Sequence, residues 1–319
     1  MFSHRSAHST APTPTNYEME TSSVLDFLAS YGRLDRLTTL GGEPLLHSGI
    51  ESILAAIRDA DIGNKRLTTN LTSIERLDIT TVKSGAIRIC ASLDGHLASI
   101  HDKIRGKGMF SKTVSNIRSL ISDGVDIEIV HTVTSASISY IFNLIEFCRT
   151  MGIRRLNLHK ISPRGNAINN NELQVSPTEW IGMIDELIRN QRRQNQDSIL
   201  LRYEQLFATR EEYRRLLSTN SYHNHAEKSY YSSDEHGHRI VLYADGKLHI
   251  SSEAFGTQAH IGTIINGVFS YNKSNMNELE LLGRIKTNES LITIINPIIS
   301  GDSKFPIVLS VSYRNQVYI

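Results

Sequence analysis

The chain has 319 residues, a formal net charge of +1, and a hydrophobic content of 39%. This composition is that of an ordinary globular protein, and a charge so close to neutral gives no reason to expect a nucleic acid or a membrane surface as partner. The sequence has no apolar run long enough for a membrane span and no apolar leader segment, so we expect a cytoplasmic protein. The two cysteines, Cys90 and Cys148, both fall in apolar runs, which excludes a disulfide framework.

Helical and strand patterns alternate along the first 190 residues, after a predicted loop over residues 1–17. Helices are predicted over residues 18–31, 50–58, 73–82, 111–122, 139–151 and 177–188. Strands are predicted over residues 33–40, 66–70, 86–93, 126–133 and 154–160. Strands that alternate with helices of this length form a parallel sheet. Because the series opens on a helix, we expect an α/β fold, a partial (βα)6 TIM-like barrel that lacks its first strand.

The pattern changes near residue 196. We therefore expect a barrel domain over residues 1–195 and a small, irregular, β-containing region over residues 196–319. Within this region, residues 198–217 look helical and residues 218–238 look like a long polar loop. A hairpin is expected around Ala244-Asp245-Gly246, and two further β-rich runs are expected near the C-terminus.

Polar residues follow the ends of the predicted strands. The first strand runs into Gly41-Gly42-Glu43-Pro44, where two glycines would let a ligand approach the backbone closely. A tight turn with Pro44 in the first turn of a helix explains the same residues. Later strands end in Asn70, in Ser92 and Asp94, and in Thr132, each of which is also a common cap or turn residue. Because the carboxyl ends of parallel strands meet at one rim, their recurrence predicts a site there.

Two segments resemble a known family. Leu40-Gly41-Gly42-Glu43-Pro44-Leu45-Leu46 resembles the GGEP motif of the radical S-adenosylmethionine enzymes. Ser92-Leu93-Asp94-Gly95, followed by His101-Asp102-Lys103-Ile104-Arg105-Gly106, resembles the fourth-strand region of the peptide-modifying branch. The resemblance covers residues 2–190 and implies a peptide or protein substrate and S-adenosylmethionine as cofactor. The residues that it implies for cofactor binding are Gly41, Gly42, Glu43, Pro44, Asn70, Ser92, Asp94, Arg105 and Thr132.

The resemblance ends at the residues that would hold the family's 4Fe–4S cluster. Family members carry CxxxCxxC in the loop before a helix like residues 18–31, and here Phe2, Ser6 and Ser9 stand at those positions. A register shifted to Ser3 supplies no thiolate either. Cluster iron is held by cysteine thiolates, whereas a serine hydroxyl stays protonated near neutral pH and a phenyl ring is no donor. The resemblance therefore implies a protein without the cluster and without radical chemistry.

A second replacement of this kind is implied downstream. Gly246 and Ser251 match the GxxxxC spacing of the SPASM-type extension, with serine in the cysteine position. Ser233 lies 13 residues before Gly246, within the spacing of that motif's preceding cysteine. The resemblance thus implies a SPASM-like C-terminal extension whose cluster cysteines are also replaced.

A histidine-rich loop leaves another function open. His223, His225, His236 and His238 form two HxH pairs, and such imidazoles suit zinc, although a solvated polar loop explains them more simply. Three hypotheses remain. The chain is a radical S-adenosylmethionine-like peptide-maturation protein that has lost cluster chemistry, an inactive module that binds a peptide or another partner, or a zinc protein.

Overall fold

The structure is a computed structural model. It describes residues 19–30, 34–83, 86–161, 167, 170–191, 193, 195, 197–208, 241–243, 245–249, 262–265, 268–271 and 307–318. Beyond Tyr203 in the sixth strand, and throughout residues 307–318, only the backbone is described.

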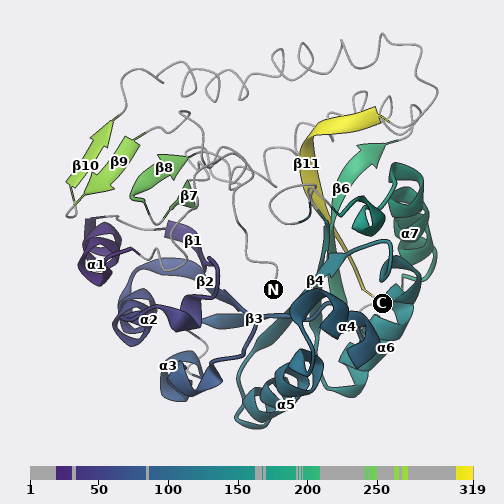
Figure 1. Ribbon diagram of the computed structural model, residues 1–319, viewed down its shortest axis with the longest axis horizontal. Coiled ribbons are helices and arrows are strands. Elements are labelled where there is room, and N and C mark those ends of the chain that lie inside the picture. Colours follow the sequence, from purple (N-terminus) through teal and green to yellow (C-terminus); the bar gives the residue numbers. More distant parts are fainter. Residues whose placement is uncertain are drawn as a thin grey trace.

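A curved sheet forms the body of the protein (Figure 1). Its seven strands lie in the order β1-β2-β3-β4-β5-β6-β11. The parallel strands are β1 (Leu34–Thr39), β2 (Ile62–Thr69), β3 (Arg88–Ser92), β4 (Ile127–Val133), β5 (Arg155–Lys160) and β6 (Leu200–Ala208), and β11 (Ile307–Tyr318) joins β6 antiparallel. Among the described strands, β1 and β11 are the two edges and do not pair, so the barrel is open. The predicted α/β fold with a partial TIM-like barrel is confirmed.

Helices cover the convex side of the sheet (Figure 1). Six match predicted helices: α1 (Thr21–Ser30), α2 (Ile50–Asp59), α3 (Ile79–Lys83), α5 (Met109–Ser122), α6 (Ile141–Thr150) and α7 (Pro177–Arg189). The helix predicted over residues 73–82 forms only as the short 3-10 turn η2 (Ile74–Arg76) and the short α3. Helix α4 (Ala98–Arg105) was not predicted. None of the helices in the described ranges is long and apolar enough to cross a membrane.

Helix α7 illustrates how the local sequence sets these elements. Ser176 caps its N-terminus in a capping box with Glu179, and Pro177 occupies the first helical turn. One face of the helix carries Trp180, Met183, Ile184 and Leu187, all buried, at the spacing of an amphipathic helix. Trp180 therefore anchors the last helix of the series on the sheet.

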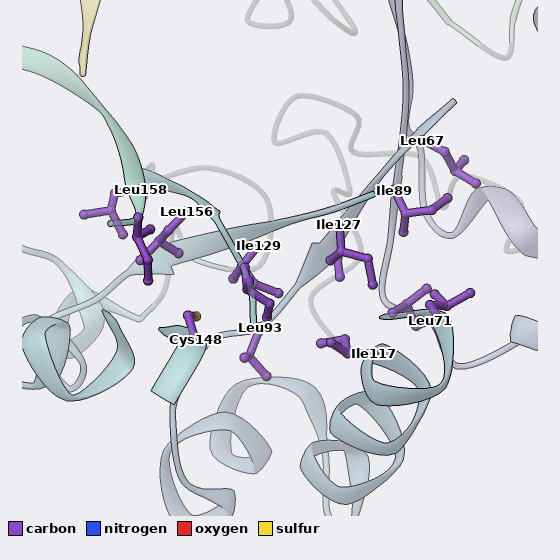
Figure 2. Close-up of a cluster of buried hydrophobic side chains, with 14 of the residues drawn as sticks. Leu67, Leu71, Ile89, Leu93, Ile117, Ile127, Ile129, Cys148, Leu156 and Leu158 are labelled. Carbon is purple, nitrogen blue, oxygen red and sulfur yellow. The ribbon is translucent and has the colours of Figure 1, made fainter. Parts of the chain in front are cut away.

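The hydrophobic core lies between the sheet and these helices (Figure 2). Alternate strand residues meet there in register, with Leu67, Ile89 and Ile127 in one row and Ile129 and Leu156 in another. Ile117 of α5 and Cys148 of α6 reach this layer from the helices. Because successive side chains of a strand point to opposite faces, the residues between them line the concave face.

The segment after residue 197 corrects one prediction. A helix over residues 198–217 was expected, but Leu200–Ala208 forms strand β6, paired in parallel with β5. Leu201 and Tyr203 are buried while Arg202 is not, which is the period-2 pattern of a strand. The parallel sheet thus continues past residue 195, and the division of the chain at that residue stays a prediction.

A small antiparallel sheet follows. Its strands are β7 (Val241–Leu242), β8 (Lys247–His249), β9 (Gly262–Ile265) and β10 (Val268–Tyr271), in the order β10-β9-β8-β7. The predicted hairpin is present as β7 and β8, and Gly246 occupies its turn with a φ of 76°. Most residues between this hairpin and β11 lie outside the described ranges.

Candidate cofactor site

Glu43 ties the end of β1 to the end of β2. Its Oε1 accepts hydrogen bonds from the Leu45 backbone N–H at 3.2 Å and from Thr69 Oγ1 at 2.5 Å, and its Oε2 accepts from the Asn70 N–H at 2.8 Å. Glu43 has extended backbone angles and is the N-cap of the turn η1 (Pro44–Leu46), with Pro44 in the first helical position. The tight turn predicted for Gly41-Gly42-Glu43-Pro44 is therefore present, and Glu43 is its anchor.

The two glycines before Glu43 are not needed by the fold. Both are exposed, and a Cβ built on Gly41 or Gly42 meets no heavy atom within 4 Å. Neither belongs to the glycines with positive φ, so an alanine would fit both the space and the backbone conformation. What glycine offers here is room for a ligand to reach the main chain.

Asn70 is occupied in its own turn. Its Oδ1 accepts hydrogen bonds from the Thr72 N–H at 2.8 Å and from Thr72 Oγ1 at 2.7 Å. The next residue, Leu71, is fully buried with a φ of 59°, an unusual conformation for a bulky side chain. Thr69 Oγ1 accepts from the Leu71 N–H at 3.0 Å, and Asn116 Nδ2 donates to the Leu71 carbonyl at 2.8 Å. Backbone strain of this kind is commonest at functional sites.

Asp94 organises the neighbouring strand ends. It is fully buried, and its carboxylate accepts hydrogen bonds from the Thr132 N–H of β4 at 3.0 Å and from Arg105 Nε of α4 at 2.5 Å. Its own N–H donates to His101 Nδ1 at 3.0 Å. Burial alone would raise the pKa of Asp94, but the Arg105 guanidinium and the hydrogen bond from the Thr132 N–H outweigh it and hold the pKa below its usual range. The carboxylate is therefore ionised, and it brings Arg105 and Thr132 together.

Most of the second motif has a structural role. A Cβ on Gly95 would lie 2.7 Å from the Ile100 side chain, so glycine is what lets α4 pack against the end of β3. Asp102 accepts from the backbone N–H groups of Gly108 at 2.7 Å and Phe110 at 2.8 Å, and so holds the start of α5. The side chain of Arg105, paired with Asp94, is a quarter exposed. Ser92, at the end of β3, is 8% exposed.

His131 was missed by the sequence analysis. It is 1% exposed in β4, and its Nδ1 lies 2.9 Å from the Leu93 carbonyl. Burial lowers the pKa of His131 despite the nearby Asp94 carboxylate, so the ring is neutral and Nδ1 carries the proton. Within the described ranges, its Nε2 has no hydrogen-bond partner. A histidine at a core-facing position of β4, two residues after Ile129, was the signal in the sequence.

The thiols of this chain do not fit an iron–sulfur cluster. The chain has two cysteines, Cys90 and Cys148, and both are 0% exposed. Burial raises the pKa of Cys90 to about 11 and that of Cys148 to about 12, so neither is a thiolate at neutral pH. Cys90 shares a row with Thr68 and Glu128 on the concave face, whereas Cys148 lies in the core on the other side of the sheet. Cluster ligation requires several thiolates at one place.

The remaining metal predictions fall outside the described residues. These are the predicted cluster positions Phe2, Ser6 and Ser9, the SPASM-type positions Ser233 and Ser251, and the zinc candidates His223, His225, His236 and His238. In the part of the chain that the structure describes, no group of three or more His, Cys, Asp and Glu side chains is placed to hold a metal ion.

Sequence comparison identifies S-adenosylmethionine-dependent proteins as relatives. No family profile matches this chain. An AdoMet-dependent heme synthase of Oleidesulfovibrio alaskensis is 25% identical over 129 residues, which is 40% of this chain and 33% of that protein. A probable GTP 3′,8-cyclase of Methanocaldococcus jannaschii is 27% identical over 140 residues, which is 44% of this chain and 47% of that protein. The matched segments thus span one third to one half of the curated relatives.

The fold is shared with solved structures of low sequence identity. The structure of anSMEcpe with bound AdoMet matches with a TM-score of 0.57 and 16% identity, covering 86% of this chain and 74% of that one. Streptococcus suis SuiB bound to its precursor peptide SuiA matches with a TM-score of 0.52 and 15% identity, covering 76% of this chain and 55% of SuiB. Together with the relatives in sequence, this shared fold supports the similarity of the chain to the radical S-adenosylmethionine superfamily.

Proposed function

We propose that this chain is a radical S-adenosylmethionine-like protein that binds S-adenosylmethionine and a peptide but does not cleave the cofactor reductively. The observation that carries the proposal is a contrast within the molecule. The exposed glycine turn is open and anchored by Glu43, while both thiols are fully buried and lie on opposite faces of the sheet.

The polar groups at the rim of the sheet are of the kinds that would bind S-adenosylmethionine. The main chain of Gly41 and Gly42 is open to a ligand's amino group, as the GGEP resemblance implies. On the neighbouring strand ends, Arg105 offers a cationic fork for a carboxylate, held in place by Asp94, and Ser92 offers a hydroxyl. When bound, S-adenosylmethionine would supply an activated sulfonium. The residues described here bind and orient it.

The absence of cluster chemistry rests on the thiols. Reductive cleavage in this superfamily needs an electron from the cluster, and the cluster needs cysteine thiolates. Phe2, Ser6 and Ser9 supply none, and Cys90 and Cys148 are buried on opposite faces of the sheet. After anaerobic reconstitution with iron and sulfide, we expect no cluster absorbance from this chain. The combined replacement of Phe2, Ser6 and Ser9 by cysteine should restore it if the surrounding loop is intact.

A peptide partner is supported by the structures that share the fold. One anSMEcpe structure contains a Cp18Cys peptide, and one SuiB structure contains the precursor peptide SuiA. The curated relatives in sequence carry the names of a heme synthase and a GTP cyclase, so a small-molecule substrate is the second candidate. Binding assays with peptides, heme precursors and GTP separate the two.

The experiment that tests cofactor binding is calorimetry with S-adenosylmethionine on a pair of glycine variants. Gly42→Ala adds a methyl group where only solvent lies, so the fold should be unchanged, but a ligand at the main chain would be displaced. Gly182→Ala, on the exposed face of α7, is the matched control. We expect at least about a tenfold loss of affinity for the first variant, as for a lost hydrogen bond or a steric clash, and none for the second. Equal affinities in both variants would contradict the placement.

A further inference from the structure

The concave face of the sheet is polar, unlike the interior of an ordinary barrel. The register and the strand alternation place these residues on it: Arg66, Thr68, Arg88, Cys90, Ser92, Glu128, Val130, Thr132, Arg155, Asn157, His159, Leu200 and Arg202. Parallel barrels fill their interior with bulky branched apolar residues. Here two members of the set are aliphatic, so this face is not built as a packed core.

Among the described side chains, the face carries more positive than negative charge. Glu128 is 1% exposed and forms an ion pair with Arg66, itself 7% exposed. At the start of the strands, Asp126 pairs with Arg155 and, at 2.9 Å, with Arg88. Arg202 lies 3.5 Å from Glu128, too far for a hydrogen bond to Oε2, which has no such partner in the described part of the chain. Among the described side chains of β2 to β6, four guanidinium groups thus share two carboxylates.

Among these four cations, Arg202 has the longest contact with a carboxylate of a described side chain, 3.5 Å to Glu128. Its side chain is 28% exposed, so it is not fully enclosed by the described residues. Burial lowers the pKa of Arg202, and so does repulsion from Arg66, Arg88 and Arg155, while Glu128 opposes this change. Asn157, its register partner on β5, has a buried Oδ1 without a hydrogen-bond partner among described residues. An excess of partly buried positive charge is costly unless an anion balances it.

This cluster is continuous with the rim site. Ser92, Val130, Asn157 and Arg202 occupy one row across β3, β4, β5 and β6. Three inter-strand steps separate Ser92 from Arg202, a distance of about 14 Å. Thr132, whose N–H is bonded to Asp94, lies two residues beyond Val130 on the same face. A ligand of a few residues could therefore span from Arg202 to the cofactor site.

We propose that the concave face binds an acidic peptide, with a carboxylate of the peptide paired to the guanidinium of Arg202. The inference rests on the proposed function for its peptide partner and adds the chemistry of that peptide. The guanidinium group of an arginine binds a carboxylate through two parallel hydrogen bonds. The excess cationic charge also attracts an anionic segment to the face. A free dicarboxylate offers the same chemical group and is distinguished in the test.

The test is calorimetry of the full chain with three probes: a six-residue peptide of alternating Glu and Gly, the same peptide with Lys in place of Glu, and succinate. We expect the Glu peptide to bind and the Lys peptide not to bind. Arg202→Gln should weaken binding of the Glu peptide at least about tenfold, the loss of one charge-assisted pair. Arg118→Gln, on the exposed face of α5, should leave it unchanged.

A variant that is expected to tighten peptide binding separates a binding role of the arginines from a purely structural one. Asp126→Asn removes the carboxylate shared by Arg88 and Arg155, so it should tighten binding of the Glu peptide several-fold. S-adenosylmethionine affinity should not change in the Arg202 variant, which keeps failure of this inference separate from failure of cofactor binding. Equal binding of the two peptides, or equal affinities in Arg202→Gln and Arg118→Gln, would overturn the proposal. Binding of succinate with the same dependence on Arg202, without binding of the peptide, would overturn the peptide assignment.

Discussion

Replacing Glu43 by glutamine should detach the glycine turn from the second strand. The substitution keeps an oxygen for Leu45 and Thr69 but places an amide N–H₂ against the Asn70 N–H, which now donates to Oε2 at 2.8 Å. One charge-assisted hydrogen bond is lost, and two donors face each other. For a half-buried carboxylate we expect a loss of about 2 kcal/mol in the free energy of unfolding, within the range for such bonds.

Urea denaturation followed by Trp180 fluorescence measures this loss, because Trp180 is the only tryptophan and is fully buried in α7. Glu51→Gln, on the exposed surface of α2, is the matched control and should change the stability by less than about 0.5 kcal/mol. If Glu43→Gln is as stable as this control, the carboxylate is not the anchor of the turn.

Three further predictions concern packing and pH. Gly49→Ala should lower the stability by at least about 1 kcal/mol, because its Cβ would lie 2.1 Å from Thr21 Oγ1, while Gly41→Ala should be neutral in the same denaturation assay; equal effects would refute the packing of α1. The folded-state pKa of Asp94 is lowered, so its contribution is present above about pH 4 and is lost as the pH falls below that value. Asp94→Asn should therefore be less stable near neutral pH and should lose less stability on acidification; an identical pH profile would contradict the ion pair with Arg105. The pKa of His131 is also lowered, so its contribution is present above about pH 6.5 and is lost as the pH falls below it. His131→Asn should flatten thermal stability against pH in that range, and an unchanged slope would show that His131 is not buried as a neutral ring.

The parallel sheet was predictable because its strands carry strong local signals. β3 and β4 carry buried aliphatic residues at alternate positions, and helices stopped by glycine separate the strands, as at Gly124 and Gly152, both with a φ of 77°. β6 was not predictable in the same way. The residues that follow it, 209–217, are rich in Arg and Glu and give the segment a helical appearance, which pairing of β6 with β5 and β11 overrides.

The site was predicted at the level of strand ends but not of contacts. The GGEP resemblance identified Glu43, yet its partners Thr69 and Asn70 lie 26 and 27 residues away and are joined to it only by the fold. Helix α4 was missed because it carries few apolar residues, and it is held by the contacts of His101 and Arg105 with Asp94. Three-dimensional charge balance, as around Arg202, leaves no local pattern in a sequence.

The most direct test of the central claim is the identity of the ligand that the protein retains. The chain would be incubated anaerobically with iron, sulfide, dithionite and S-adenosylmethionine, separated from free ligand, and the bound molecule identified by mass spectrometry. We predict intact S-adenosylmethionine, retained by the wild-type chain and Gly182→Ala and lost from Gly42→Ala. Recovery of 5′-deoxyadenosine above a no-protein control would contradict the loss of radical chemistry, and recovery of no ligand from the wild-type chain would contradict cofactor binding.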